Sequence, residues 1–322
     1  MGRLHADELF TRHRANPIIG ARDLPYPVNS VFNAGATRCG DETLLLMRVE
    51  DRRGLSHLTV ARSRDGVNDW HIDPAPTLSP LPDTHPEELW GIEDPRITRI
   101  DSLNEWAVVY TAYGPNGPLV SLATTRDFTT FERRGIVLPP ENKDAALLPK
   151  QFDGRWAMLH RPVPAAPGAG AHIWLCFSPD LSHWGDHRLL IPARHGGWWD
   201  ADKIGLSAPP LWTEQGWLVL YHGVKKTVSG CIYRLGLALL DAQDPRRIIA
   251  RGDEWVFGPR EPCEMTGDVD KVVFPCGWVA DGNEIRLYYG GADACICLAT
   301  ARIVELLDWL QHHAHDASNL EE

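Results

Sequence analysis

The sequence has no long apolar segment. None of its hydrophobic runs approaches the ~20 consecutive apolar residues that a transmembrane helix needs. The N-terminal stretch, residues 1–17, is polar and lacks the apolar core of a secretory signal peptide. We therefore expect a protein that neither spans a membrane nor is secreted, and that works in the cytoplasm.

The cysteines form no recognisable framework. There are seven, an odd number, and no two are spaced as Cys-x-x-Cys. Only Cys295 and Cys297 lie close together in the sequence. The pattern argues against a zinc ribbon and against a disulfide-bonded domain, and it agrees with a reducing cytoplasm. We expect no metal site and no bound cofactor.

Positive charge is in the minority. The chain has 32 Lys and Arg residues against 43 Asp and Glu residues, which gives a net charge of −11. An acidic protein is a poor partner for nucleic acid. An anionic small ligand would need a local cationic pocket inside this acidic chain.

Helical patterns are confined to the two ends, at about residues 1–16 and 303–312. The sequence between them consists of short apolar runs separated by Gly, Pro, Asn and Asp, which is typical of strands and turns. We predict one all-β domain over residues 1–322 with short N- and C-terminal helices. These ends would offer a docking surface for a homo-oligomer.

A motif recurs about every 60 residues within this β region. Each copy is an apolar strand followed by Ser/Thr-x-Asp and then by an aromatic residue. The Asp of the motif is Asp65, Asp127 or Asp180 in three copies, and Asp241 in a looser fourth copy. Ser-x-Asp by itself is ordinary turn chemistry, but regular spacing with several strands per unit is typical of propeller blades. We predict a five-bladed β-propeller, with blades near 28–78, 86–139, 140–192, 200–250 and 255–302.

Polar residues interrupt otherwise apolar strands near the start of each predicted blade. The basic ones are Arg48, Lys143, Arg161, Lys203 and His222, and the carboxylates are Asp94, Asp144 and Asp293. Burying such groups is costly unless they are paired. Because the inner strands of a propeller converge on its axis, we expect these side chains to meet in one site. Cations would suit a phosphate dianion there, and carboxylates would suit sugar hydroxyls.

The segment Gly91–Arg96 is the centre of this pattern. Pro95 restricts the backbone of Asp94, which precedes it. The acidic residues Glu87, Glu88 and Glu93, close to Asp94 in the sequence, are predicted to raise its pKa and to make it a proton donor. Asp-Pro is also a common turn dipeptide; the basic residues downstream favour the catalytic interpretation. Farther along, residues 198–200 are interpreted as lining a sugar subsite, with packing at a blade edge as the alternative.

The chain resembles glycoside hydrolase family 130, the β-mannoside phosphorylases and a few related mannosidases. The motifs that carry the resemblance occur in the same order and span most of the chain: Phe32–Ala36, Arg48–Val49, Gly91–Ile97, Asn142–Ala145, His160–Pro162, Lys203–Gly205, Gly216–Val224 and Tyr288–Asp293. The segment Asp23–Ser30 resembles the mannooligosaccharide-type branch.

The resemblance implies a five-bladed propeller with Asp94 as the general acid. It implies that Arg48, Lys143, Arg161, His222 and Tyr233 surround phosphate and the reacting sugar. Asn33, Arg96, Asp144, Lys203 and Asp293 are expected to bind the sugar substrate. A phosphorolytic enzyme needs only the acid, whereas an inverting hydrolase also needs a carboxylate base.

We therefore expect inverting phosphorolysis of terminal β-mannosides by inorganic phosphate, giving α-mannose 1-phosphate. The favoured substrates are β-1,4-manno-oligosaccharides or mannosyl-glucose and mannosyl-N-acetylglucosamine. The alternatives, in decreasing order, are hydrolysis of β-mannosides on the same scaffold, phosphorolysis of β-1,2-mannosides, and a sugar-binding propeller without catalysis.

Overall fold

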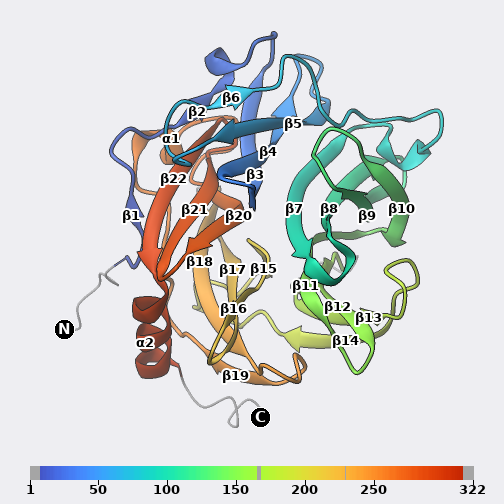
Figure 1. The fold of residues 1–322 in the computed structure, drawn as a ribbon. Coiled ribbons are helices and arrows are strands. Elements are labelled where there is room, and N and C mark those ends of the chain that lie inside the picture. Colours follow the sequence, from blue (N-terminus) through green and yellow to red (C-terminus); the bar gives the residue numbers. More distant parts are fainter. Residues whose placement is uncertain (1–7, 165–167, 229, 315–322) are drawn as a thin grey trace.

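The strands form five antiparallel sheets arranged as blades around a common centre (Figure 1). This computed structural model describes residues 8–164, 168–228 and 230–314. The predicted five-bladed β-propeller is confirmed. No helix among the described residues has the length and apolar character needed to cross a membrane.

Blades one to four are each made from one continuous segment. Blade one contains β3 (Ser30–Cys39), β4 (Glu42–Glu50), β5 (Ser56–Ser63) and β6 (His71–Ile72). Blade two contains β7 (Ile92–Ile100), β8 (Glu105–Gly114), β9 (Gly117–Thr125) and β10 (Glu132–Leu138). Blade three contains β11 (Asn142–Phe152), β12 (Arg155–Pro162), β13 (Ile173–Ser178) and β14 (Gly185–Ile191). Blade four contains β15 (Lys203–Leu206), β16 (Leu211–Thr213), β17 (Gly216–Thr227), β18 (Gly230–Leu240) and β19 (Ile248–Arg251).

Blade five joins the two ends of the chain. Its β20 (Val273–Asp281), β21 (Glu284–Gly291) and β22 (Cys295–Arg302) come from the C-terminal part. Two short N-terminal strands, β1 (Thr11–Arg12) and β2 (Ile19–Gly20), pair antiparallel with β22. Figure 1 shows β1, in blue, beside β22, in red. The ring is therefore closed by hydrogen bonds between the first and last strands.

The predicted N-terminal helix is wrong over residues 8–16, and residues 1–7 lie outside the described part. The backbone here pairs with blade five instead of with itself: the His13 amide donates to the Leu298 carbonyl at 2.8 Å. Arg12 is fixed by the buried Glu264, with 2.7 Å between Nε and Oε1. These long-range partners outweigh a local helical pattern, whose propensity is only a weak preference.

The helices are few. The C-terminal helix is confirmed as α2 (Ile303–His313), which buries Leu306, Leu307 and Leu310. A short helix, α1 (Pro262–Met265), precedes β20. In the described part of the chain, three single 3₁₀ turns occupy Ala21–Asp23, Pro86–Glu88 and Asp101–Leu103.

The repeated Ser/Thr-x-Asp motif is the turn that follows the third strand of a blade. The Asp carboxylate accepts hydrogen bonds from the backbone amides two and three residues later, as in Asp65 with Val67 and Asn68 at 2.8 Å each. Asp127, Asp180 and Asp241 make the same pair of bonds. The aromatic residue then folds over the turn, since the Trp70 indole donates to the Val67 carbonyl and the Trp184 indole to the Leu181 carbonyl.

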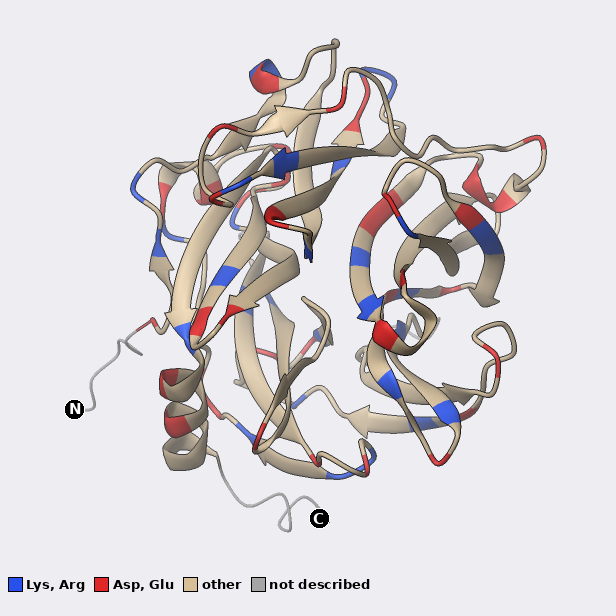
Figure 2. Ribbon diagram, in the orientation of Figure 1, with Lys and Arg blue, Asp and Glu red and all other residues tan. Residues whose placement is uncertain are grey.

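The apolar core lies between neighbouring blades. Leu44 and Leu58 of blade one pack in one cluster with Ile97 and Val108 of blade two. Hydrogen bonds cross the same boundaries, such as Thr98 Oγ1 to the Leu147 carbonyl at 3.2 Å. The inner strands β3, β7, β11 and β15 contact one another in order around the ring. Figure 2 shows that β7, which borders the centre, carries both acidic and basic bands.

Candidate active site

Three inner strands carry the same irregularity. Asn33 on β3, Asp94 on β7 and Asp144 on β11 have positive φ angles of 46°, 50° and 53°. Each lies where the register with the next strand shifts. Such bulges redirect a side chain out of the regular pleat. All three side chains are nearly buried, with exposures of 3%, 3% and 1%.

Asp94 is held by groups from blade one. Asn33 Nδ2 donates to Asp94 Oδ1 at 2.9 Å, and Arg48 Nη1 donates to the same oxygen at 3.0 Å. Arg48 also donates from Nη2 to Glu93 Oε1 at 3.0 Å and from Nε to Ser56 Oγ at 2.9 Å. Arg48 is therefore engaged with two carboxylates, and Glu93 is a partner that the sequence analysis did not assign.

The predicted rise in the pKa of Asp94 is wrong. Burial would raise it, but the charges of Arg48, Lys143 and Arg96 together with the Asn33 hydrogen bond lower the pKa of Asp94 below its ordinary value. The acidic neighbours are outweighed because Glu93 is itself paired with Arg48, while the cations lie close to Asp94. In this form of the protein Asp94 is a carboxylate.

Asp293 shows the opposite shift. Burial and then the negative charge of Asp94 raise the pKa of Asp293 to about 7. Asp293 has a φ of 51° in the turn between β21 and β22. Because the negative charge of Asp94 disfavours a second carboxylate beside it, Asp293 carries a proton below about pH 7.

Asp144 organises a second group on blades three and four. Arg161 Nε donates to Asp144 Oδ2 at 2.7 Å, and His222 Nε2 lies 3.5 Å from the same oxygen. Although burial opposes it, the charge of Arg161, followed by those of Arg96 and Lys143, lowers the pKa of Asp144. Arg161 thus keeps both Nη groups outside this bond.

Arg96 connects the two groups. Its Nη1 donates to the Asp94 carbonyl at 3.1 Å, and its Nη2 lies 3.7 Å from Asp144 Oδ1. The guanidinium also donates to the carbonyls of Ser207 and Leu206, at 2.7 and 2.8 Å. At 1% exposure, Arg96 braces both Asp bulges.

Two lysines complete the site without a carboxylate of their own. Within the described residues, Lys143 and Lys203 make no hydrogen bond and no ion pair shorter than 4.0 Å. Lys143 pairs in register with Arg161 across β11 and β12. Lys203 Nζ lies 5.4 Å from the centre of the Tyr233 ring. Burial and then the charge of Arg161 lower the pKa of Lys203, as expected where cations are crowded together.

His222 is a neutral member of the set. Burial lowers the pKa of His222 to about 3, so the expectation that it adds a positive charge is wrong. Its ring lies 4.6 Å from the ring of Phe274. Burial, followed by Asp144, raises the pKa of Tyr233 to about 12, so its hydroxyl keeps its proton. Both side chains can therefore donate a hydrogen bond to an anion without bearing charge.

Two glycines make room for these side chains. A Cβ on Gly205 would overlap Asp144 Oδ2 and would lie 2.7 Å from His222 Cε1. A Cβ on Gly290 would overlap Asn33 Oδ1. Gly205 lies in one of the family motifs, but its role could not be predicted from sequence, because the close approach of a distant side chain leaves no mark in the local pattern.

Residues 198–200 differ in their surroundings. Trp198 is exposed and, together with Trp199, lines a cavity of about 420 Å³. Trp199 is 6% exposed and stacks on Tyr221 with 5.6 Å between ring centres. Asp200 is fully buried and binds Arg251 and Arg194, at 2.7 and 3.1 Å. The alternative, packing within a blade, is correct for Asp200, and a sugar subsite at Trp198 and Trp199 stays a prediction.

The site therefore brings together the predicted residues in two linked groups. Asn33, Arg48, Asp94 and Asp293 lie on one side, and Asp144, Arg161, Lys203, His222 and Tyr233 on the other, with Arg96 and Lys143 between them. A cavity of about 320 Å³ adjoins the second side and is lined in part by Arg161 and Lys203. One side is acidic and the other is cationic.

Comparison with known proteins agrees with this geometry. Residues 13–312 match the family model described as beta-1,4-mannooligosaccharide phosphorylase. The chain belongs to glycoside hydrolase family 130. Within this family, the chain is 37% identical over 290 residues to a 1,2-beta-oligomannan phosphorylase of Thermoanaerobacter sp., covering 87% of this chain and 91% of the relative.

Two further relatives of family 130 show how closely the scaffold is kept. A beta-1,4-mannooligosaccharide phosphorylase of Ruminococcus albus is 32% identical over 316 residues, 95% of this chain and 92% of the relative. The solved complex of the Listeria innocua beta-1,2-mannobiose phosphorylase with beta-1,2-mannobiose superposes with a TM-score of 0.86 at 30% identity. That match covers 94% of this chain and 99% of the other. Relatives of similar identity are thus named for different linkages.

Proposed function

We propose that this protein is an inverting β-mannoside phosphorylase. Inorganic phosphate attacks C1 of a terminal β-mannosyl unit, the bond to the acceptor oxygen breaks, and α-mannose 1-phosphate and a shortened acceptor leave. The observation that carries the proposal is the cationic side of the site. There Lys143, Arg161 and Lys203 surround one carboxylate, that of Asp144.

The charges on this side suit phosphate better than water as the nucleophile. Three cations against one carboxylate leave a local excess of positive charge, and the nearby His222 is neutral. A phosphate dianion would offset that excess and, being an anion already, needs no base to activate it. An attacking water would need a carboxylate base and would gain nothing from the cations. The geometry therefore favours phosphorolysis over hydrolysis.

We assign the phosphate to Lys143, Arg161, Lys203 and Tyr233, with a neutral hydrogen bond from His222. Arg161 can use its two Nη groups as a fork, because Asp144 occupies Nε only. Arg48 was expected at the phosphate; because it bonds to Asp94 and Glu93, we propose that it positions the acid instead. Asn33, Arg96, Asp144 and Asp293 are assigned to positioning the sugar and the acid.

Binding of phosphate would also prepare Asp94 as the general acid. Lys143 and Arg96 are among the charges that lower its pKa. A dianion beside Lys143 would cancel part of their effect and raise the pKa of Asp94. Asp293, whose pKa is about 7, can then share its proton with Asp94. Asp94 would therefore become protonated, and able to donate its proton, when phosphate is bound.

The preferred substrates in this proposal are β-1,4-manno-oligosaccharides or mannosides of glucose and N-acetylglucosamine. The description of the matching family model supports this preference. A relative named for the 1,2 linkage is 37% identical and one named for the 1,4 linkage is 32% identical, so a reverse-reaction screen must decide. The enzyme is given α-mannose 1-phosphate with mannose, glucose, N-acetylglucosamine or a β-1,2-mannobiose acceptor, and phosphate release and product linkage are measured.

The test of the reaction type is a comparison with and without phosphate. The enzyme is incubated with β-1,4- and β-1,2-manno-oligosaccharides, and mannose and mannose 1-phosphate are separated. We expect mannose 1-phosphate of α configuration only in the tubes with phosphate. Equal amounts of free mannose in both tubes, without mannose 1-phosphate, would instead assign the protein to the hydrolases, and the absence of any product with bound sugar would favour a lectin.

A further inference from the structure

Three cysteine side chains meet behind the turn that carries Asp293. The Sγ atoms of Cys263, Cys295 and Cys297 all lie within 4.8 Å of one another. Cys297 Sγ is 3.8 Å from Cys263 Sγ and 3.9 Å from Cys295 Sγ. Cys263 belongs to α1 and the other two to β22, so the fold brings together residues more than thirty positions apart in sequence. All three are free thiols.

The spacing of these sulfur atoms is that of ligands around one metal ion. Tetrahedral zinc sites have metal–sulfur bonds of about 2.3 Å, which places neighbouring sulfurs about 3.8 Å apart. Cys295 and Cys297 alternate with Ile296 along β22 and therefore lie on the same face of the strand. Cys263 approaches that face from α1. The three thiols form one side of a coordination shell without any large rearrangement.

We propose that Cys263, Cys295 and Cys297 form a binding site for one thiophilic metal ion of the Zn²⁺ class. On binding, each sulfur exchanges its proton for the metal, and the protons pass to the solvent. A water molecule or a backbone carbonyl completes the four ligands; the carbonyl oxygens of Gly291 and Cys263 lie 3.7 and 4.0 Å from Cys295 Sγ. The site does not depend on the reaction proposed above.

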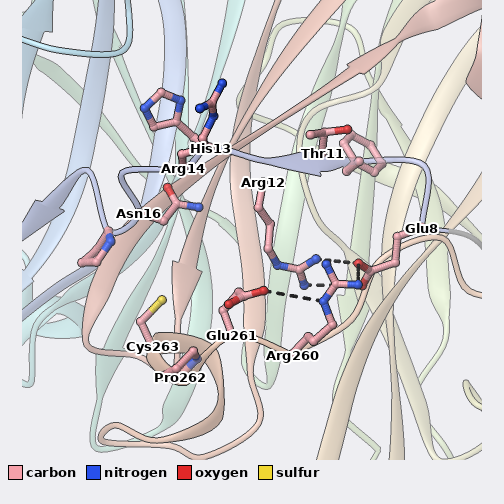
Figure 3. Close-up of a pocket in the computed structure, with 12 residues that line it drawn as sticks. Glu8, Thr11, Arg12, His13, Arg14, Asn16, Arg260, Glu261, Pro262 and Cys263 are labelled. Carbon is pink, nitrogen blue, oxygen red and sulfur yellow. Dashed lines mark hydrogen bonds and ion pairs between the residues drawn. The ribbon is translucent and has the colours of Figure 1, made fainter.

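An ion can reach the cluster from a surface cavity. A cavity of about 730 Å³ lies between the N-terminal segment and α1, and Cys263 is one of its lining residues. Figure 3 shows the Cys263 side chain there, together with Asn16, Arg12 and Glu261. Cys263 is half-buried, whereas Cys295 and Cys297 are buried behind it. The cluster thus has one ligand at an entrance and two in the interior.

The place of the cluster in the fold gives such an ion a structural role. Gly291 lies between the backbone of α1 and the sulfur atoms of Cys295 and Cys297. A Cβ at Gly291 would be 2.8 Å from the Cys263 carbonyl oxygen and 3.4 Å from each of those two sulfur atoms. Gly291 is two residues before Asp293. An ion bound by Cys263 of α1 and by the two cysteines of β22 would link these two elements on either side of Gly291. It would thereby restrain the turn that carries Asp293.

The experiment measures metal binding by sulfur directly. The full-length protein is reduced, stripped with a chelator and dialysed against Zn²⁺ or Cd²⁺; bound metal is determined by mass spectrometry and Cd²⁺–thiolate bonds by their ultraviolet charge-transfer absorption. We expect one ion per chain and a higher melting temperature with metal, because a ligand that binds only the folded state stabilises it. Cys263→Ser should abolish the charge-transfer band and the thermal shift.

Cys39→Ser is the matched control, since Cys39 is also half-buried but belongs to no cluster of three metal-ligating side chains among the described residues. It should bind metal as the parent protein does. Wild-type protein without a charge-transfer band would overturn the proposal, as would a band of equal strength in Cys263→Ser. If the unreduced protein is lighter by two hydrogen atoms and has lost two titratable thiols, two of its cysteines form a disulfide bond, which would contradict the metal site. Serine is close to cysteine in shape, so Cys263→Ser should fold, and circular dichroism of the variant checks this. Cys263→Ala repeats the metal-binding test with a side chain that has no oxygen ligand.

Discussion

Asn33 of blade one donates a hydrogen bond of 2.9 Å to Asp94 of blade two, and both residues occupy bulges with positive φ. The hydrogen-bond partner of each bulged side chain lies on the other blade and not on its own strand. Each bulge turns a side chain toward the centre of the ring, where it meets a partner from the next blade. The acidic centre is therefore assembled between blades, and changes at these positions should alter chemistry more than folding.

Asp94→Asn tests the assignment of the acid. Asn has the same shape and can still accept hydrogen bonds from Asn33 or Arg48, but it has no carboxyl proton to give. We expect phosphorolysis to fall about 10²- to 10⁴-fold, the usual contribution of general acid catalysis, with little change in melting temperature. Initial rates on unactivated β-mannosides provide the measurement. Glu93→Gln, which alters the other carboxylate bound by Arg48, should lose much less; the reverse order would move the acid to Glu93.

Arg161→Lys separates phosphate binding from bracing. The lysine keeps the charge but loses the fork of two Nη groups. Because a hydrogen bond to a charged group contributes about 1.5–3 kcal/mol, we expect the KM for phosphate to rise about 10- to 100-fold and the KM for the mannoside to change far less. Arg62→Lys, at the Asp73 pair on blade one, controls for the substitution itself. If the mannoside constant moves first, Arg161 holds the sugar; a lower melting temperature with both constants intact would make it structural.

The raised pKa of Asp293 predicts a pH-dependent stability. Burial and Asp94 raise this pKa from its ordinary value of 3.8 to about 7, so the folded state favours the protonated form. That contribution is complete below the unfolded pKa and is lost as the pH rises through the folded one, which sets a window from about 4 to about 7. Over this window the loss is at most about 1.4 kcal/mol per pH unit, and partial exposure of the side chain reduces it.

Asp293→Asn should remove this dependence, since the amide stays neutral. Urea unfolding of both proteins at several pH values measures it. We expect the variant to gain stability relative to wild type as the pH is raised from 5 to 8. A constant difference across this range would mean that Asp293 is ionised throughout.

Gly205→Ala tests the crowding around Asp144. The added methyl group would overlap Asp144 Oδ2 and press on His222. Neither neighbour can yield easily, because Asp144 is tied to Arg161. We expect a loss of about 1–3 kcal/mol in the free energy of unfolding and a larger KM for phosphate. Gly185→Ala, on the same half of the ring, has no atom within 4 Å of its Cβ position and should be nearly neutral. If both variants keep the free energy of unfolding and the KM for phosphate of the parent protein, Asp144 and His222 can move aside without loss, and the prediction is wrong.

The sequence by itself determined the repeat and the identity of the polar residues. The Ser/Thr-x-Asp turns are local: the carboxylates of Asp65 and Asp180 bind amides only two and three residues away, so the chain pattern predicts both the turns and the number of blades. The alternating apolar runs likewise predict strands because the side-chain period of two is a local property. The interruptions by Asp94, Asp144 and Arg161 could be recognised for the same reason.

Only the tertiary structure decided the charges and the closure. Asp94 is a carboxylate because cations, among them Arg48 and Lys143 of other blades, outweigh the effect of burial. His222 is neutral because it is buried. No local pattern contains either cause. The N-terminal segment is a strand and not a helix because its hydrogen-bond partners lie on β22, at the far end of the sequence. Cys263 meets Cys295 and Cys297 because α1 packs on blade five, which brings together residues that are more than thirty positions apart in the sequence.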